Sequence, residues 1–270
     1  MKLPVPLRAA LTVCMVLGLA FLYIPLLLIV LNSFNSSRTF GFPPTGFTLE
    51  WWQKAAASSG ALSALGTSVV AGLCAMVIAL GLGTMAAFAV QRYAFFGRTT
   101  ISFLVVLPIT LPGIITGIAL NATFVQVLGP LGVALGLATV IIGHATFCIV
   151  IVYNNVQARL RRMGSSLEEA SADLGATGWQ TFWRVTLPNV RGALIAGAVL
   201  AFALSFDEIV VTTFTAGPAI QTLPLWIFNN LFRPNQAPVV NVVAAVLALL
   251  AVVPVWLAQR FSDDSTASRI

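Results

Sequence analysis

The chain has 270 residues, of which 59% are hydrophobic and only 8% charged, and its formal net charge is +6. Soluble domains carry about 25% charged residues, so the composition excludes an ordinary soluble protein and predicts an all-α protein that crosses a membrane several times.

Six apolar segments are long enough to cross a bilayer as helices, which takes about 20 residues. They cover residues 8–31, 61–90, 100–120, 133–157, 191–215 and 239–259. The first has an apolar core too long for a cleaved signal peptide, so we expect it to remain as an anchor. The third contains Pro108, Pro112 and Gly113, which predict a break in its helix.

The basic residues predict the orientation of these spans. With the N-terminus in the cytoplasm, 11 of the 14 lysines and arginines lie on the inner side of the membrane. The three on the outer side are Arg38, Lys54 and Arg233. Inner loops carry such an excess, so both termini are expected in the cytoplasm. The net positive charge is then explained without a nucleic-acid partner.

We expect three parts along the chain. Residues 1–60 hold the first anchor and an outer interfacial segment, residues 61–260 form a core of five spans with a loop at 159–190, and residues 261–270 are a short cytoplasmic tail.

The outer segment, residues 41–60, predicts a short helix capped by Thr48. Trp51 and Trp52 on this helix are expected to anchor it at the level of the lipid headgroups, with Lys54 beside them. A contact with a partner protein is the alternative for these tryptophans.

The one sizeable polar region, residues 159–192, predicts two short helices. The first is expected to start at a capping box, in which Ser165 pairs with Glu168 or Ser166 with Glu169.

The same region contains signals for the turn and for the second helix. Gly175 is the expected C-cap of the first helix, because glycine adopts the left-handed conformation at low cost. Thr177 and Gln180 form another capping box, and Pro188 is expected to end the second helix. Such a pair could lie on the membrane surface or dock another protein.

The spacing in this region favours docking. It resembles the E-A-A-x3-G-x9-I-x-L-P pattern of ABC-importer permeases, with Ser171 in place of the second Ala and Val185 in place of Ile. The whole chain is similar to the second permease subunit of bacterial spermidine/putrescine importers, which are type I ABC importers. The blocks that carry this resemblance are NSFNSS (32–37), GFTLEWW (46–52), GHATFCIVIVYNN (143–155), LEEASADLGATGW (167–179) and LAFALSFDEIVVTTFTAGP (200–218).

The resemblance implies six transmembrane helices with a cytoplasmic helix-turn-helix coupling loop, in the bacterial inner membrane. It also implies a sister permease subunit, a cytoplasmic ATPase dimer, and a periplasmic or lipid-anchored solute-binding protein. The residues it assigns to ATPase coupling are Glu168, Glu169, Ala170, Asp173, Gly175, Leu187 and Pro188.

We expect no catalytic, cofactor or metal site in the chain. A Walker A loop requires G-x-x-x-x-G-K-[ST], and the only lysines, Lys2 and Lys54, lack that context. ATP hydrolysis is therefore expected on a separate subunit. The single histidine, His144, has no partners for a zinc site or a catalytic triad. It forms either an interhelical hydrogen bond or part of a gate in the pathway.

Asp207 and Glu208 interrupt the fifth apolar span. A charged side chain at the bilayer centre costs about 2.5–3.5 kcal/mol on insertion scales, so a function is expected for this pair. Asp207 lies roughly 22 Å along a helix from Gly192, which is past mid-bilayer. Adjacent helical residues point about 100° apart, so we expect only one acid to face the pathway. We favour Asp207, with Glu208 paired or protonated, while the reverse and a purely structural hydrogen bond remain open.

A negative site suits a cationic amine, and the resemblance implies putrescine or spermidine. One departure weakens the case for spermidine, because the resembling permeases carry an acid after the proline of the third span, where this chain has Gly113. The alternatives are an importer of an opine or aminophosphonate, a scaffold, and an ion-coupled secondary transporter with Asp207, Glu208 and His144 as its relay. A second broken helix would favour the ion-coupled transporter.

Overall fold

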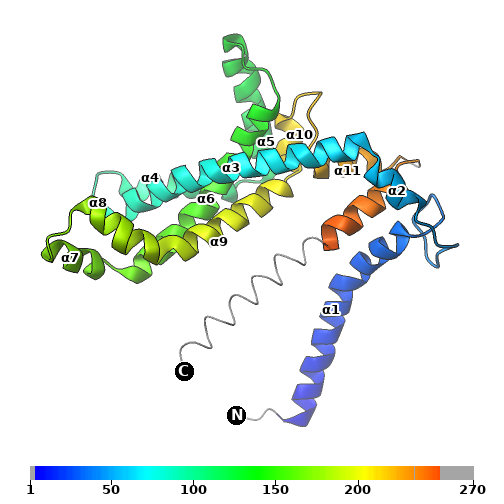
Figure 1. Ribbon diagram of the computed structural model, residues 1–270, viewed down its shortest axis with the longest axis horizontal. Helices are drawn as coiled ribbons and strands as arrows, with labels where there is room; N and C mark the ends of the chain where they lie inside the picture. Colours follow the sequence, from blue (N-terminus) through cyan, green and yellow to red (C-terminus); the bar gives the residue numbers. More distant parts are fainter. Residues whose placement is uncertain (1–3, 234, 250–270) are drawn as a thin grey trace. The chain divides into compact units, whose positions relative to one another are not determined.

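The computed structural model describes residues 4–233 and 235–249, which fold into helices joined by short loops (Figure 1). The helices are α1 (Val5–Ser33), α2 (Glu50–Ala56), α3 (Ser59–Arg92), α4 (Arg98–Thr110), α5 (Gly113–Ala122), α6 (Leu137–Met163), α7 (Ser166–Asp173), α8 (Gly178–Thr181), α9 (Leu187–Phe206), α10 (Val210–Thr215), α11 (Leu223–Leu231) and a last helix, Ala237–Leu249. They belong to two compact units: the core unit, residues 63–226, and the end unit, which holds the described residues before 63 and after 226.

The all-α membrane fold is confirmed. Within the described ranges, five helical stretches are long and apolar enough to cross a membrane. They are Val5–Ser33, Ser59–Arg92, Gly113–Leu131, Leu137–Met163 and Gly178–Phe206. The sixth predicted span, 239–259, begins within the helix Ala237–Leu249, and its second half lies outside the described residues.

The predicted break in the third span is confirmed at Pro112, one of the three residues named for it, but the end of the span differs from the prediction. Pro108 lies inside α4, and the break falls at Leu111 and Pro112. Leu111 is extended because a residue before proline avoids the α conformation, and Pro112 then caps α5. After α5 the chain continues as a π-helical turn, Thr123–Leu128, and a short 3-10 turn, so this span ends at Leu131 rather than at residue 120.

The fifth span differs at both ends from the predicted 191–215. A π-helical turn, Phe182–Thr186, joins α8 to α9, so Pro188 does not end the second loop helix. This wider turn directly before Pro188 accommodates the missing N–H of proline, and one continuous helix runs from Gly178 to Phe206. The helix then stops before Asp207, so the predicted span is broken.

The core of the core unit lies between α3, α6 and α9, which run side by side (Figure 1). Its buried residues include Ala75, Ala79 and Ala87 on α3, Val152, Tyr153 and Val156 on α6, and Val190 and Ala201 on α9. Small residues on α3 allow the backbones to come close, as is common between helices in lipid. A Cβ atom at Gly83 would lie only 2.8 Å from the Ile149 carbonyl oxygen.

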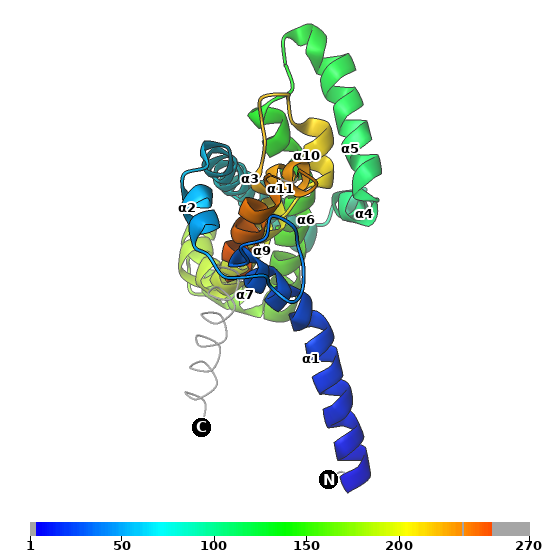
Figure 2. The same cartoon turned by 90° about the vertical axis from the view of Figure 1, so that its right-hand side faces the viewer.

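The short helix α10 packs between α5 and α6 (Figure 2). The Asn121 amide on α5 donates to the Phe214 carbonyl at 2.7 Å. The Thr139 hydroxyl on α6 donates to the Thr215 carbonyl at 2.7 Å. These bonds satisfy carbonyls at the end of α10, which have no partner within so short a helix.

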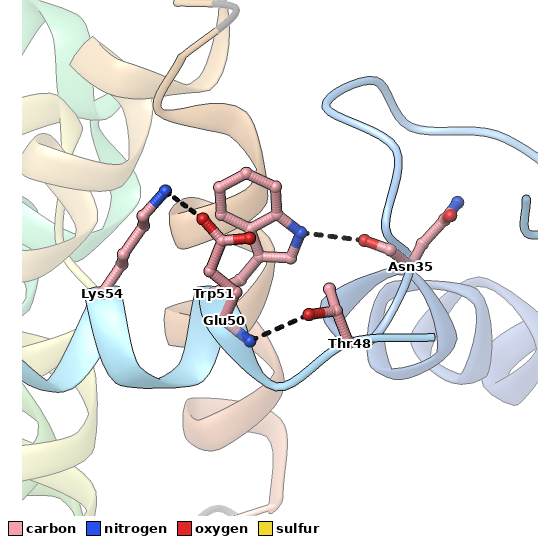
Figure 3. A network of polar contacts seen from close by, with 5 residues as sticks. All are labelled: Asn35, Thr48, Glu50, Trp51 and Lys54. Carbon is pink, nitrogen blue, oxygen red and sulfur yellow. Dashed lines mark hydrogen bonds and ion pairs between the residues drawn. The ribbon is translucent and has the colours of Figure 1, made fainter. Parts of the chain in front are cut away.

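The end unit contains the network drawn in Figure 3. The Thr48 hydroxyl accepts from the Glu50 N–H at 3.1 Å, but the N-cap of α2 is Leu49, so the predicted cap at Thr48 is wrong by one residue. The Trp51 indole N–H donates to the Asn35 carbonyl at 2.9 Å, and Trp51 is only 6% exposed. The prediction that Trp51 anchors this helix at the lipid headgroups is therefore wrong. A hydrogen bond from Lys54 lowers the pKa of the exposed Glu50 carboxyl.

The bond between Trp51 and Asn35 is expected to protect the loop that carries Arg38. Trp51→Phe removes the N–H donor at a cost of about 1 kcal/mol. We expect several-fold faster trypsin cleavage after the exposed Arg38, measured in detergent. Trp52→Phe is the matched control, because the Trp52 indole nitrogen has no hydrogen-bond partner within the described part of the chain. Equal cleavage rates in the two variants would contradict this role for Trp51.

Candidate functional site

The loop helices α7 and α8 meet at a tight turn that the sequence predicts correctly. Gly175 has a φ of +82°, its N–H donates to the Ala172 carbonyl at 2.8 Å, and the Ala176 N–H donates to the Ser171 carbonyl at 3.1 Å. This pair of bonds is a Schellman motif, whose left-handed residue is usually glycine. The Ser171 hydroxyl also lies 3.0 Å from the Thr181 hydroxyl, which joins the two helices across the turn.

The capping box of α8 is confirmed as well. The Gln180 N–H donates to the Thr177 hydroxyl at 3.3 Å, and the Thr177 N–H donates to the Gln180 side-chain oxygen at 2.9 Å. Both ends of the turn are thus held by hydrogen bonds, which makes it a defined element rather than a loose linker.

The capping box predicted for α7 is wrong, because Glu168 has other partners. No side-chain hydrogen bond caps the N-terminus of α7. One Glu168 carboxylate oxygen lies 2.8 Å from Arg92 Nε at the end of α3, and the other accepts from the Thr186 hydroxyl at 2.7 Å. Arg92 also donates to the Gly164 carbonyl at 2.7 Å. Glu168 therefore ties the loop to α3 and to the start of the fifth span.

The other predicted coupling residues differ in their exposure to solvent. Glu169, Ala170, Asp173 and Pro188 are exposed, whereas Leu187 packs against the core. Large apolar side chains are exposed beside the acids of α7: Leu167, Leu174, Trp179 and Trp183. Leu174 is 90% exposed and Trp179 71%. Exposed apolar side chains of this kind suit contact with a partner protein or with the membrane surface.

The second site is the break between α9 and α10. Asp207 is exposed and Glu208 is half-buried. The Glu208 carboxylate accepts from the Val211 N–H at 2.8 Å, so it satisfies a free donor at the start of α10. The expectation that both acids belong to one continuous helix is therefore wrong. Acidic side chains compete with the helix for backbone donors, which the sequence pattern did not reveal.

Both helix breaks line one pocket of about 150 Å³. Its lining includes Pro108, Gly113 and Thr116 from the third span and Glu208 and Val211 from the fifth. The Thr116 hydroxyl is buried and has no hydrogen-bond partner among the described residues. Gly113, where the resembling permeases carry an acid, thus lies on the same pocket as Glu208. The pocket offers the Glu208 carboxylate, which suits an ammonium group.

His144 is fully buried and lies between the two sides of this break. Its Nδ1 is 2.7 Å from the Ser205 hydroxyl, and its Nε2 is 2.8 Å from the Thr212 hydroxyl. These are interhelical hydrogen bonds, as in the first of the two alternatives for His144. The sequence analysis did not find these two partners of His144. The available signal was that Ser205 and Thr212 lie on either side of the acid pair.

The comparison with known families assigns the class of the protein. Residues 79–264 match the family described as "Binding-protein-dependent transport system inner membrane component". The chain belongs to this family. It is a permease subunit of a binding-protein-dependent ABC importer of the inner membrane and not an enzyme. An ATPase and a solute-binding protein are implied as its partners.

Relatives of known name cover most of the permease. It is 36% identical over 238 residues to the putrescine transport system permease protein PotI of Escherichia coli K12, which covers 87% of this chain and 84% of that protein. It is 34% identical to the spermidine/putrescine permease PotC of the same strain, with 92% and 91% covered. A putative 2-aminoethylphosphonate permease, PhnV of Salmonella typhi, is 32% identical, with 85% and 86% covered.

Solved structures show the same fold at low sequence identity. A chain of a bacterial ABC transporter that imports alginate matches with a TM-score of 0.71 and 16% identity, and the match covers 96% of this permease and 99% of that chain. A chain of the MetNI methionine transporter matches with a TM-score of 0.57 and 22% identity, with 75% and 92% covered.

The contacts of Glu168 are expected to order α7. Glu168→Ala removes the ion pair with Arg92 and the acceptor of the Thr186 hydroxyl, and a hydrogen bond to a charged group contributes about 1.5–3 kcal/mol. We expect hydrogen exchange of the α7 amides to become at least tenfold faster. Glu169→Ala serves as the control because the Glu169 side chain is exposed. Equal protection in the wild type and Glu168→Ala would show that the contacts do not order the helix.

Proposed function

We propose that the permease pairs with a sister permease and forms half of the pathway for a cationic amine of the polyamine class. The observation that carries this proposal is the Glu208 carboxylate on a pocket between two helix breaks. The named relatives PotI and PotC support it, since their names specify putrescine and spermidine.

The proposed orientation places both termini and the loop helices in the cytoplasm. There the exposed face of α7, with Glu169, Ala170 and Asp173, docks the ATPase dimer. Gly175 sets the angle between α7 and α8, while Glu168 holds α7 to the membrane helices. Because α8 continues into α9 as one helix, movement of the docked loop is passed to the break at its far end.

The two acids have separate roles in the proposed pathway. Asp207 is exposed in the single subunit, so it faces the passage shared with the sister permease and meets the solute. Glu208 caps α10 with one oxygen and adds negative charge to the pocket.

Two alternatives are less consistent with this site. An aminophosphonate carries an anionic group, and the name of PhnV makes that solute worth testing. Among the described residues, however, no lysine or arginine lines the pocket of the two breaks. The ion-coupled transporter is the other alternative, and the second helix break, between α9 and α10, is a feature that such a transporter would share. Membership of the ABC permease family argues against that mechanism.

The decisive experiment reconstitutes the permease with its sister permease, ATPase and binding protein in proteoliposomes. Uptake of putrescine, spermidine and 2-aminoethylphosphonate is measured at matched concentrations, with and without ATP. The proposal requires ATP-dependent uptake of an amine. Uptake of the aminophosphonate alone, or uptake that an ion gradient drives without ATP, would overturn it.

The proposed roles of the acids predict different effects of neutral substitutions. Asp207→Asn is expected to lower amine uptake at least tenfold, mainly by raising KM, because the ammonium group loses a charged partner. Glu208→Gln retains the oxygen that caps α10, so a smaller loss is expected. Co-purification with the ATPase controls for assembly. Wild-type uptake by Asp207→Asn would leave a structural role as the better account of that acid.

The position of Gly113 predicts a change of solute preference. Gly113→Asp adds a second carboxylate to the pocket at the start of α5, where an acid is favourable and a Cβ atom would lie at an ordinary contact distance of 3.5 Å from Val210. We expect the ratio of spermidine to putrescine uptake to rise, because spermidine carries one more ammonium group. Gly113→Asn has nearly the same volume without the charge and is the matched control. An equal change in both variants would show that size, not charge, matters.

A further inference from the structure

The hydrogen bonds around His144 have a defined direction. The Thr212 hydroxyl donates to the Glu208 backbone carbonyl at 2.8 Å, so its single proton is already used. Its oxygen must therefore accept from His144 Nε2, which carries the proton of the neutral ring. His144 Nδ1 is then the acceptor for the Ser205 hydroxyl.

This chain of bonds crosses the helix break. Ser205 lies in the last turn of α9 and Thr212 in the first turn of α10. The chain runs from Ser205 through His144 and Thr212 to the backbone of Glu208. His144 itself is on α6, a helix that packs against both α9 and α10. A side chain of α6 thus joins the two halves of the broken span and reaches the backbone of the acid pair.

We propose that His144 is a positioning residue, whose Nε2 bond to Thr212 fixes the start of α10 so that Asp207 and Glu208 keep their places in the pathway. The imidazole does not contact the solute, because it is fully buried and both ring nitrogens are occupied. Of the experiments that test this role of His144, only the uptake measurements depend on the proposed amine function.

The two bonds of His144 are separable by substitution. In His144→Gln, the side-chain amide can take the place of ring Nε2 and donate to Thr212. In His144→Asn, the shorter side chain can take only the place of Nδ1, and His144→Leu removes both bonds. In the same way, Thr212→Ser keeps the hydroxyl that Thr212→Val removes.

We expect His144→Leu, His144→Asn and Thr212→Val to raise the KM for amine uptake about tenfold, with a smaller change in Vmax, as the loss of one buried hydrogen bond predicts. His144→Gln and Thr212→Ser are expected to recover most of this loss. The double variant His144→Asn with Thr212→Val should be no worse than either single variant, since each substitution already removes the same bond between residues 144 and 212. Co-purification of each variant with the ATPase tests assembly.

A measurement that needs no solute separates this proposal from the proposed function. Hydrogen exchange of the α10 amides, including the Val211 N–H held by Glu208, should become faster in His144→Asn and stay slow in His144→Gln. If the wild-type complex imports no amine, the proposed function fails while this readout still tests His144. Equal exchange and equal KM in the Gln and Asn variants would overturn the positioning role.

Discussion

In hydrocarbon, every backbone N–H and C=O must find a partner inside the protein, and this constraint explains where the permease interrupts its helices. A break in a span requires other groups to take over the hydrogen bonds of the helix. At the end of the fifth span, Glu208 accepts from the start of α10, and Asn121 and Thr139 donate to its end. The Glu208 carboxylate is thus one of the groups that allow the helix to break there.

At the other end of this span the helix stays continuous although it contains a proline. Pro188 has no N–H to donate, and the π-helical turn before it keeps α8 and α9 in one helix. The loop is held from the side by Glu168, through Arg92 and Thr186. The helix is therefore continuous from the loop to Phe206 and breaks at the acid pair. A continuous helix that joins the loop to the break is suited to passing a movement in alternating access.

Composition and local motifs predicted most of the fold. The spans follow from long apolar runs, and the turn at Gly175 and the capping box at Thr177 follow from local chemistry that tertiary contacts did not override. The errors occurred where side chains form long-range bonds. Glu168 was expected to cap its own helix but pairs with Arg92, 76 positions earlier in the sequence. The end of α9 at Phe206 depends on His144 and Thr212, which no periodicity connects.

The π-helical turn at Phe182–Thr186 also has a geometric consequence. A π turn is in effect one extra residue within an α-helix, and one residue corresponds to a rotation of about 100° around the helix axis. The turn therefore sets the angular phase between the exposed tryptophans of the loop and the side chains of α9. Loss of one residue there would leave every contact surface chemically intact and point the loop in another direction. In the proposed docking, the length of this five-residue segment matters as much as the residues that would touch the ATPase.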